Sequence, residues 1–247
     1  PESLQLEGTE LSFNGFKTRA VGSLDLKPTP KLNLGIEVDG ELKQLNSLHP
    51  ELQAFNGKLS GNIRLKGPYI SPTARLKITL ASFVHKETPP YDIHLQGQYQ
   101  DQHLKIENLQ LSAPDGGNAQ IQGELSLKDT FTTSFQATLK DASIGHILDA
   151  SGLPNAWIRA PISGTLSGGG TISPLSLKAK AALSLSHFDS LTSSYANPQS
   201  RKILKLQTGT LDADVSVEPT FCALSNGRIQ RGNSKLALEG VFYYATK

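Results

Sequence analysis

The chain has 247 residues, of which 37% are hydrophobic, and its 24 basic and 22 acidic side chains leave a formal net charge of +2. A disordered chain has fewer apolar residues and a larger net charge, and a nucleic-acid-binding protein has clustered basic residues, so both classes are excluded. The single cysteine, Cys222, excludes an internal disulfide. No run approaches the roughly 18 consecutive apolar residues of a membrane helix. Because the chain begins Pro1-Glu2 and contains no Met, we expect a piece of a longer protein, with any targeting or anchoring segment outside it.

Apolar and polar residues alternate with a period of two along most of the chain, which predicts β-strands with one apolar face. The first strands form a hairpin whose turn is Asn14-Gly15, a pair suited to the positive φ angles of a two-residue loop. This turn places Phe13 opposite Phe16 and Glu10 opposite Arg19, and both pairs are favourable. Asn-Gly pairs at 56–57 and 226–227 indicate further tight turns.

A later hairpin is predicted to turn at Gln100-Asp101, which sets Leu95 opposite Ile106. After Ile106 the apolar residues move from even to odd positions. This change of phase predicts a β-bulge near Asn108.

Helical spacing of apolar residues is confined to two short segments, Leu42 to Leu48 and residues 143–148, each about two turns long. The clearest strand spans 175–185, and at about 3.3 Å per residue it would be roughly twice the usual strand length. Residues 191–200 contain few apolar side chains and are predicted to form a loop.

Several phrases recur in the same order along the chain. Gly-Ser-Leu-Asp-Leu-Lys at 22–27 corresponds to Gly-Glu-Leu-Ser-Leu-Lys at 123–128, and Gly-Lys-Leu-Ser-Gly at 57–61 corresponds to Gly-Thr-Leu-Ser-Gly at 164–168. We therefore expect one elongated domain over residues 1–247, built of quasi-repeats at about 8–110 and 111–247.

Three histidines, at positions 85, 94 and 103, invite a metal-site interpretation. In the hairpin register above, however, His94 faces Glu107 and His103 faces Gln98, so the two imidazoles are not partners. We expect solvated histidines and no metal.

Other polar motifs also favour structural roles. The glycines at 168–170 lack the Lys-Ser/Thr and the helix of a phosphate-binding loop, so we expect a tight turn. Asp212 and Asp214 share one side of a strand and are expected on its polar face, and Trp157 is expected to anchor a loop. We predict no catalytic residue, no cofactor and no enzyme activity.

A sheet with one apolar face must cover that face, and the predicted helices are too few and too short to do so. The sheet either folds against itself as a β-sandwich or curls into a trough whose apolar lining is filled by a ligand. We favour an all-β fold with few short helices, in which an elongated, curled antiparallel sheet forms a U-shaped apolar groove. Aromatic residues make up only 6% of the chain, which suits acyl chains better than sugars or bases.

The candidate lipid-binding groove is lined by the alternating apolar positions of the predicted strands: Leu24, Leu26, Leu34, Ile36, Val38, Leu76, Ile78, Leu80, Leu95, Ile106, Leu125, Leu127, Phe135, Leu139, Leu175, Leu177, Leu183, Leu185, Leu211, Val215, Val217, Leu236, Leu238 and Phe242.

These phrases resemble the AsmA/TamB superfamily of long bacterial envelope proteins. The resemblance covers most of the chain and rests on Gly-x-Leu-x-Leu at 22–26 and 123–127, on Gly-x-Leu-Ser-Gly after a short helix, and on Ser234-Lys-Leu-Ala-Leu-Glu-Gly240. It implies a periplasmic protein tethered to the inner membrane through segments outside this chain. It also implies a non-enzymatic function, in which the groove binds phospholipid acyl chains and conducts phospholipid between the inner and outer membranes. Support of outer-membrane protein assembly, with an outer-membrane β-barrel protein as partner, is the accompanying role.

Two other classes stay open at this point. A structural or adhesin-like β-sandwich would use the same alternation to build a dry core and would bind no lipid. A glycan-binding or hydrolytic β protein is disfavoured, because the sequence offers neither an aromatic platform nor an acid/base pair.

Overall fold

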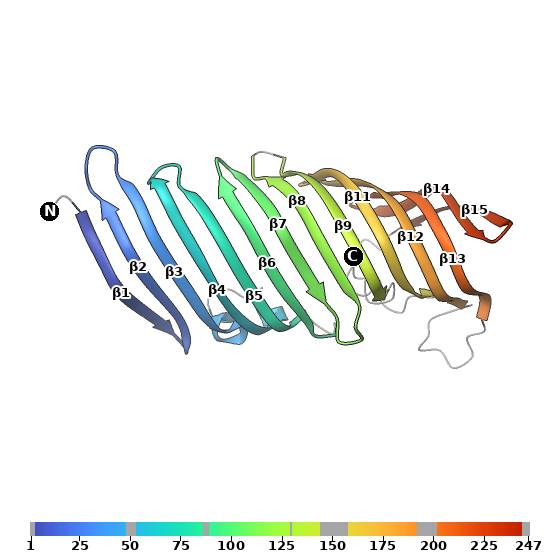
Figure 1. The fold of residues 1–247 in the computed structure, drawn as a ribbon, viewed down its shortest axis with the longest axis horizontal. Coiled ribbons are helices and arrows are strands. Elements are labelled where there is room, and N and C mark those ends of the chain that lie inside the picture. The colour runs from blue at the N-terminus through green and yellow to red at the C-terminus, as the bar shows by residue number, and fades with distance from the viewer. Residues whose placement is uncertain are drawn as a thin grey trace. The chain divides into compact units, whose positions relative to one another are not determined.

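A computed structural model describes residues 3–47, 53–85, 89–128, 130–143, 158–191 and 202–243. Nearly all of these residues lie in β-strands (Figure 1), and the all-β fold class predicted from the alternation is confirmed. Among the described residues, no helix has both the length and the apolar character needed to cross a membrane.

The strands form one antiparallel sheet in which consecutive strands are hydrogen-bonded neighbours, except that β11 follows β9 and the short β10 pairs with β12. The described strands belong to a single sheet that is not closed, which is consistent with the predicted curled, elongated sheet. The chain divides into two compact units, residues 1–112 with 124–128, and residues 113–123 with 129–247. The predicted repeat boundaries stay a prediction.

The strands of the first unit, ending with β8 that is shared with the second, are β1 (Ser3–Phe13), β2 (Phe16–Asp25), β3 (Lys31–Glu41), β4 (Phe55–Pro68), β5 (Thr73–His85), β6 (Tyr91–Gln100), β7 (His103–Ser112) and β8 (Asn118–Ser126). Those of the second unit are β9 (Thr132–Ser143), β10 (Ile158–Arg159), β11 (Pro161–Ile172), β12 (Leu175–Leu191), β13 (Lys202–Val217), β14 (Phe221–Arg231) and β15 (Ser234–Tyr243).

The first hairpin has the predicted register. Phe13 pairs with Phe16 and Glu10 with Arg19. Its two turn residues have the positive φ angles that a tight hairpin requires, 49° at Asn14 and 89° at Gly15.

The register predicted for the β6–β7 hairpin is wrong. Asp101 and Gln102 form its turn, with φ angles of 49° and 64°, which moves each cross-strand pairing by two residues. The register shift between Gln96 and Gly97 adds one more, so Leu95 lies opposite Leu109 instead of Ile106. Neither turn residue is a glycine, so the sequence carries no marker of which pair takes the positive φ angles. The predicted irregularity near Asn108 is confirmed, because the register shifts between Ile106 and Asn108.

Within the first predicted helical segment, the structure has η1 (Leu42–Leu45), a single 3₁₀ turn. The backbone N–H of Glu41 donates to the Gln44 side chain at 2.9 Å, and the backbone N–H of Asn46 donates to the Lys43 carbonyl. This last hydrogen bond joins residues three apart, which is the pattern of a 3₁₀ turn and not of an α-helix. Leu48, residues 144–148 and the predicted loop at 192–200 lie outside the described residues, as does Trp157.

The glycines at 168–170 do not form the predicted tight turn; they lie inside β11. A Cβ added at Gly168 would overlap the carbonyl oxygen of Lys178 on β12. These glycines therefore allow close approach of neighbouring strands. Gly22 and Gly123, which share the first repeated phrase, behave alike, since a Cβ on either would overlap a carbonyl oxygen of the next strand, that of Asn33 or of Ser134.

Candidate functional site: the apolar face of the sheet

In the first unit, cross-strand register aligns the apolar side chains of β2 to β7 into rows on one face. One row runs through Ala20, Ile36, Ile63 and Leu76, and continues through Gly97 and Ile106. Directly paired residues of an antiparallel sheet point to the same side, so these residues share one surface.

The side chains of this apolar face are shielded from water only by their neighbours on the same face. Ile36, Ile63 and Leu76 are half-buried, and Ala74 is the only residue of the first unit among the buried hydrophobic residues. Neighbouring side chains on the same face exclude water laterally, and no second sheet layer lies over them in the described part of the chain. The tops of these side chains therefore face outward.

The opposite face of the same strands is polar. The row between the apolar rows runs through Arg19, Glu37, Asn62 and Lys77 to Gln96. Charged and amide side chains are well hydrated, so this face needs no cover. The two faces of the first unit thus differ sharply in what they can bind.

In the second unit, the corresponding face is more closed. Leu183 and Leu211 are each 9% exposed, and both belong to a buried apolar cluster with Leu185 and Ile229. Figure 1 shows β14 and β15 running across the direction of β11 to β13, so the sheet is strongly turned within this unit. Leu183 and Leu185, predicted as groove lining, are therefore packed among protein side chains.

Most predicted lining residues lie on strands with their side chains half-buried or buried. In the first unit these are Leu24, Leu34, Ile36, Val38, Leu76, Ile78, Leu80, Leu95 and Ile106, and the half-buried Leu125 lies in β8. In the second unit they are Phe135, Leu139, Leu175, Leu177, Leu183, Leu185, Leu211, Val215 and Val217.

Five predicted positions differ from this group. Leu26 and Leu127 lie just beyond the ends of β2 and β8 and are exposed. Leu236 and Leu238 are exposed on β15, and for Phe242 only the backbone is described. The period of two extends past a strand end without any change in the sequence pattern, so periodicity alone assigns Leu26 and Leu127 to the apolar face.

The prediction omitted several residues that belong to the face. Leu59, Ile63 and Leu65 on β4 occupy it, and their spacing of two residues is the same signal that identified the others. Ile162 on β11, which is 3% exposed, and Ile229 on β14 were likewise missed.

The three histidines do not meet. His94 lies opposite Gln110, not Glu107, and its Nδ1 is 3.1 Å from the Thr79 hydroxyl. His103 lies opposite Gln100, not Gln98, and the His85 ring stacks on Phe55 with centroids 4.9 Å apart. No group of three or more potential metal ligands occurs among the described residues.

The two aspartates of β13 lie on the polar face, as predicted. Asp214 accepts a 2.7 Å hydrogen bond from the amide of Asn226, and Asp212 lies opposite Arg228 on β14. Each carboxylate thus has a neighbour on the adjacent strand, and the pair has no access to the apolar face.

No family model, curated protein or solved structure matches the chain. The apolar face is therefore interpreted from its own geometry and chemistry.

Proposed function

We propose that the apolar face binds phospholipid acyl chains and conducts phospholipid between the inner and outer membranes, as the resemblance to the AsmA/TamB superfamily implies. The observation that carries this proposal is the uncovered aliphatic surface of the first unit, backed by a polar face on the other side of the same strands. A soluble protein rarely exposes a large contiguous apolar surface unless the surface binds something.

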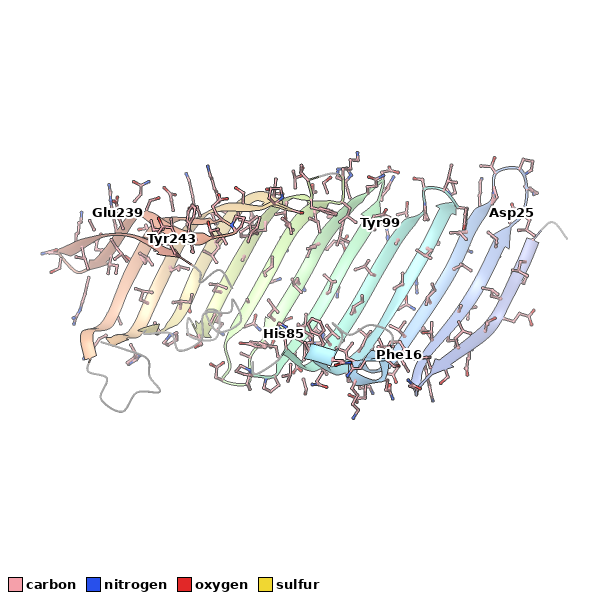
Figure 2. The ribbon with its side chains drawn as sticks, turned by 180° about the vertical axis from the view of Figure 1, so that it is seen from behind. Phe16, Asp25, His85, Tyr99, Glu239 and Tyr243 are labelled. Carbon is pink, nitrogen blue, oxygen red and sulfur yellow. The ribbon has the colours of Figure 1, made fainter. Side chains whose placement is uncertain are left out.

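The chemistry of the surface favours an aliphatic ligand. Its central rows contain Ile, Leu, Val, Ala and Gly, whereas aromatic residues such as Phe16 and Tyr99 lie toward the ends of their strands (Figure 2). Aliphatic side chains offer no stacking platform for a sugar or a base. Each methylene group of an acyl chain that leaves water for such a surface contributes about 0.8 kcal/mol. A chain of ordinary length thus gains enough to bind without any polar contact.

The proposed setting is the periplasm, with the chain tethered to the inner membrane through segments outside it. Support of outer-membrane protein assembly is the second role we propose. This second role rests on the resemblance to the AsmA/TamB superfamily alone.

The proposal is tested by site-specific photocrosslinking in cells of a lipid-producing bacterial host. A photoreactive phenylalanine analogue replaces Ile63 on the apolar face or its neighbour Asn62 on the polar face. We expect lipid adducts from position 63 and none from position 62, because adjacent residues of a strand point to opposite sides. Mass spectrometry of lipids co-purified with the intact chain identifies the species.

Equal adduct yields at both positions would show that lipid contacts both faces of the sheet and does not prefer the apolar one. No adduct at position 63 would contradict lipid binding and favour a structural or adhesin-like role.

A further inference from the structure

In the first unit, the turns at one end of the strands are connected to one another by hydrogen bonds along a single edge of the sheet. The N–H of Tyr69 in the β4–β5 turn donates to the Pro30 carbonyl in the β2–β3 turn at 2.9 Å. The Ser71 hydroxyl donates to Asp101 in the β6–β7 turn at 2.7 Å. The N–H of Leu127 then donates to the Gln102 carbonyl at 2.7 Å. We call residues 26–31, 66–72, 101–102 and 127–128 the loop edge.

Figure 2 shows where this edge lies. Asp25 and Tyr99 are on its side of the strands, and Phe16 and His85 are on the opposite side, where the chain turns in the other direction. The hydrogen bonds make the loop edge a connected element instead of a set of independent turns.

The loop edge presents large apolar side chains to solvent. Ile70 is 89% exposed and Tyr69 63% exposed, while Leu26 and Leu127 are 49% and 38% exposed. Turns are ordinarily built from polar residues, Gly and Pro, so an isoleucine at the tip of one is unusual. Pro68 and Pro72 flank the pair, and the N–H of Ser71 closes the turn on the Pro68 carbonyl. The turn therefore holds its apolar side chains outward.

The charged side chains beside these residues are mostly basic. Exposed Lys27, Lys31, Lys66 and Lys128 belong to the loop edge, whose only aspartate is Asp101; Asp25, directly beside it, forms an ion pair with Lys27 at 4.0 Å. Asp101 accepts hydrogen bonds from Ser71 and Gln100, so its carboxylate is engaged by neutral donors. The edge thus combines protruding aliphatic and tyrosine side chains with an excess of lysine.

We propose that the loop edge docks on the surface of an anionic phospholipid bilayer, with Tyr69 and Ile70 inserted at the level of the headgroups. Tyrosine prefers the membrane interface, and lysines near it are attracted to anionic lipids. Lysine is by contrast depleted in protein–protein interfaces, which argues against a protein as the occupant. The proposal does not depend on acyl-chain binding by the apolar face.

The loop edge also adjoins the end of the apolar face. Leu24 pairs with Leu32 next to the β2–β3 turn, and Ala74 pairs with Tyr99 next to the β6–β7 turn. Docking at this edge would bring the outermost apolar row close to the bilayer, where an acyl chain could pass between the two without crossing a polar surface.

The test is co-sedimentation of the whole chain with vesicles of phosphatidylcholine, alone or mixed with phosphatidylglycerol. We expect the unmodified chain to bind the mixed vesicles more tightly, and the double variant Tyr69→Ser/Ile70→Ser to lose roughly tenfold in affinity. Val21→Ser is the matched control, because Val21 is 47% exposed but lies on the polar face. Its affinity should remain within about twofold of the unmodified chain.

Insertion is measured independently with brominated acyl chains, which quench nearby tryptophan. Ile70→Trp should be quenched and Val21→Trp should not, with the native Trp157 common to both. Unchanged binding by the double variant, or equal quenching at both positions, would overturn the proposal.

A third variant separates this proposal from lipid binding by the apolar face. Ile36→Asp, beside position 63 on the same apolar row, should abolish lipid crosslinking from the probe at position 63 and leave vesicle binding intact. If Ile36→Asp abolished vesicle binding while the double variant retained it, the bilayer contact would belong to the apolar face, and the loop-edge proposal would fail alone.

Discussion

Replacing one leucine or isoleucine by aspartate should have very different effects in the two units. Ile36 is half-buried between Ala20 and Ile63, and its top is uncovered. Leu183 is 9% exposed and belongs to the buried cluster of the second unit. The same chemical change therefore leaves the new carboxylate hydrated in one case and desolvated in the other.

The magnitudes follow from burial. Ile36→Asp forfeits roughly half the transfer free energy of a fully buried isoleucine, about 1 kcal/mol, and up to about 1 kcal/mol more from lower strand propensity. Leu183→Asp loses a buried leucine, at about 2–5 kcal/mol, and also carries the cost of an unpaired buried charge. Against a typical stability of about 5–15 kcal/mol, we expect the first variant to fold and the second to unfold its unit.

Urea denaturation followed by circular dichroism measures the free energy of unfolding of both variants, with Ser184→Asp, on the exposed side of β12, as a mild control. A loss for Ile36→Asp as large as that for Leu183→Asp would refute the reasoning. It would mean that the face of the first unit is closed over in solution and not available to a ligand.

Three further outcomes are expected. Gly22→Ala should lower the free energy of unfolding by about 2 kcal/mol or more, because its φ of 138° is unfavourable for alanine and the new Cβ meets the Asn33 carbonyl. Gly240→Ala, which has open space around it, should change the free energy of unfolding by less than about 0.5 kcal/mol. Chemical denaturation of both variants measures the difference. Gln102→Gly should raise the melting temperature, with a gain of about 0.5–1 kcal/mol, since residue 102 has a φ of 64°; a lower melting temperature would contradict the turn geometry. A chelator should leave the melting temperature unchanged, and a drop in thermal scans would reveal a metal site that the described residues do not show.

The alternation of apolar residues was sufficient to predict the strands, because successive residues of a strand point to opposite faces and only one face of this sheet is apolar. It was also sufficient for the register of the first hairpin, where Asn14-Gly15 forms the turn. The tight turns predicted at the Asn-Gly pairs 56–57 and 226–227 are wrong, because both pairs lie inside strands, β4 and β14, at shifts of register. At the β6–β7 turn the positive φ angles fall on Asp101 and Gln102, and a glutamine there gives no local signal. A shift of one position in the turn then moved the whole pairing.

In the second unit, the sequence predicts which residues share the apolar face but not how deeply they are buried. Periodicity identified Leu183 and Leu185 as members of the apolar face, but it carries no information on how strongly the sheet turns and hence on whether the face is closed. The loop edge was not predicted at all. Its signal was available in Pro68-Tyr-Ile-Ser-Pro72, where an apolar pair occupies a turn flanked by prolines.

Glycines give the apolar face of the first unit a corrugated relief. Gly61 on β4 lies between Val38 and Ile78 on the flanking strands, and Gly22 on β2 and Gly97 on β6 likewise lie between large aliphatic side chains. These glycines lie on alternate strands, about 10 Å apart across the sheet, but in three different rows, so the hollows are staggered along the strand direction. A flexible chain that rested in them would run obliquely to the strands, and moving it would require crossing the side-chain ridges between the hollows.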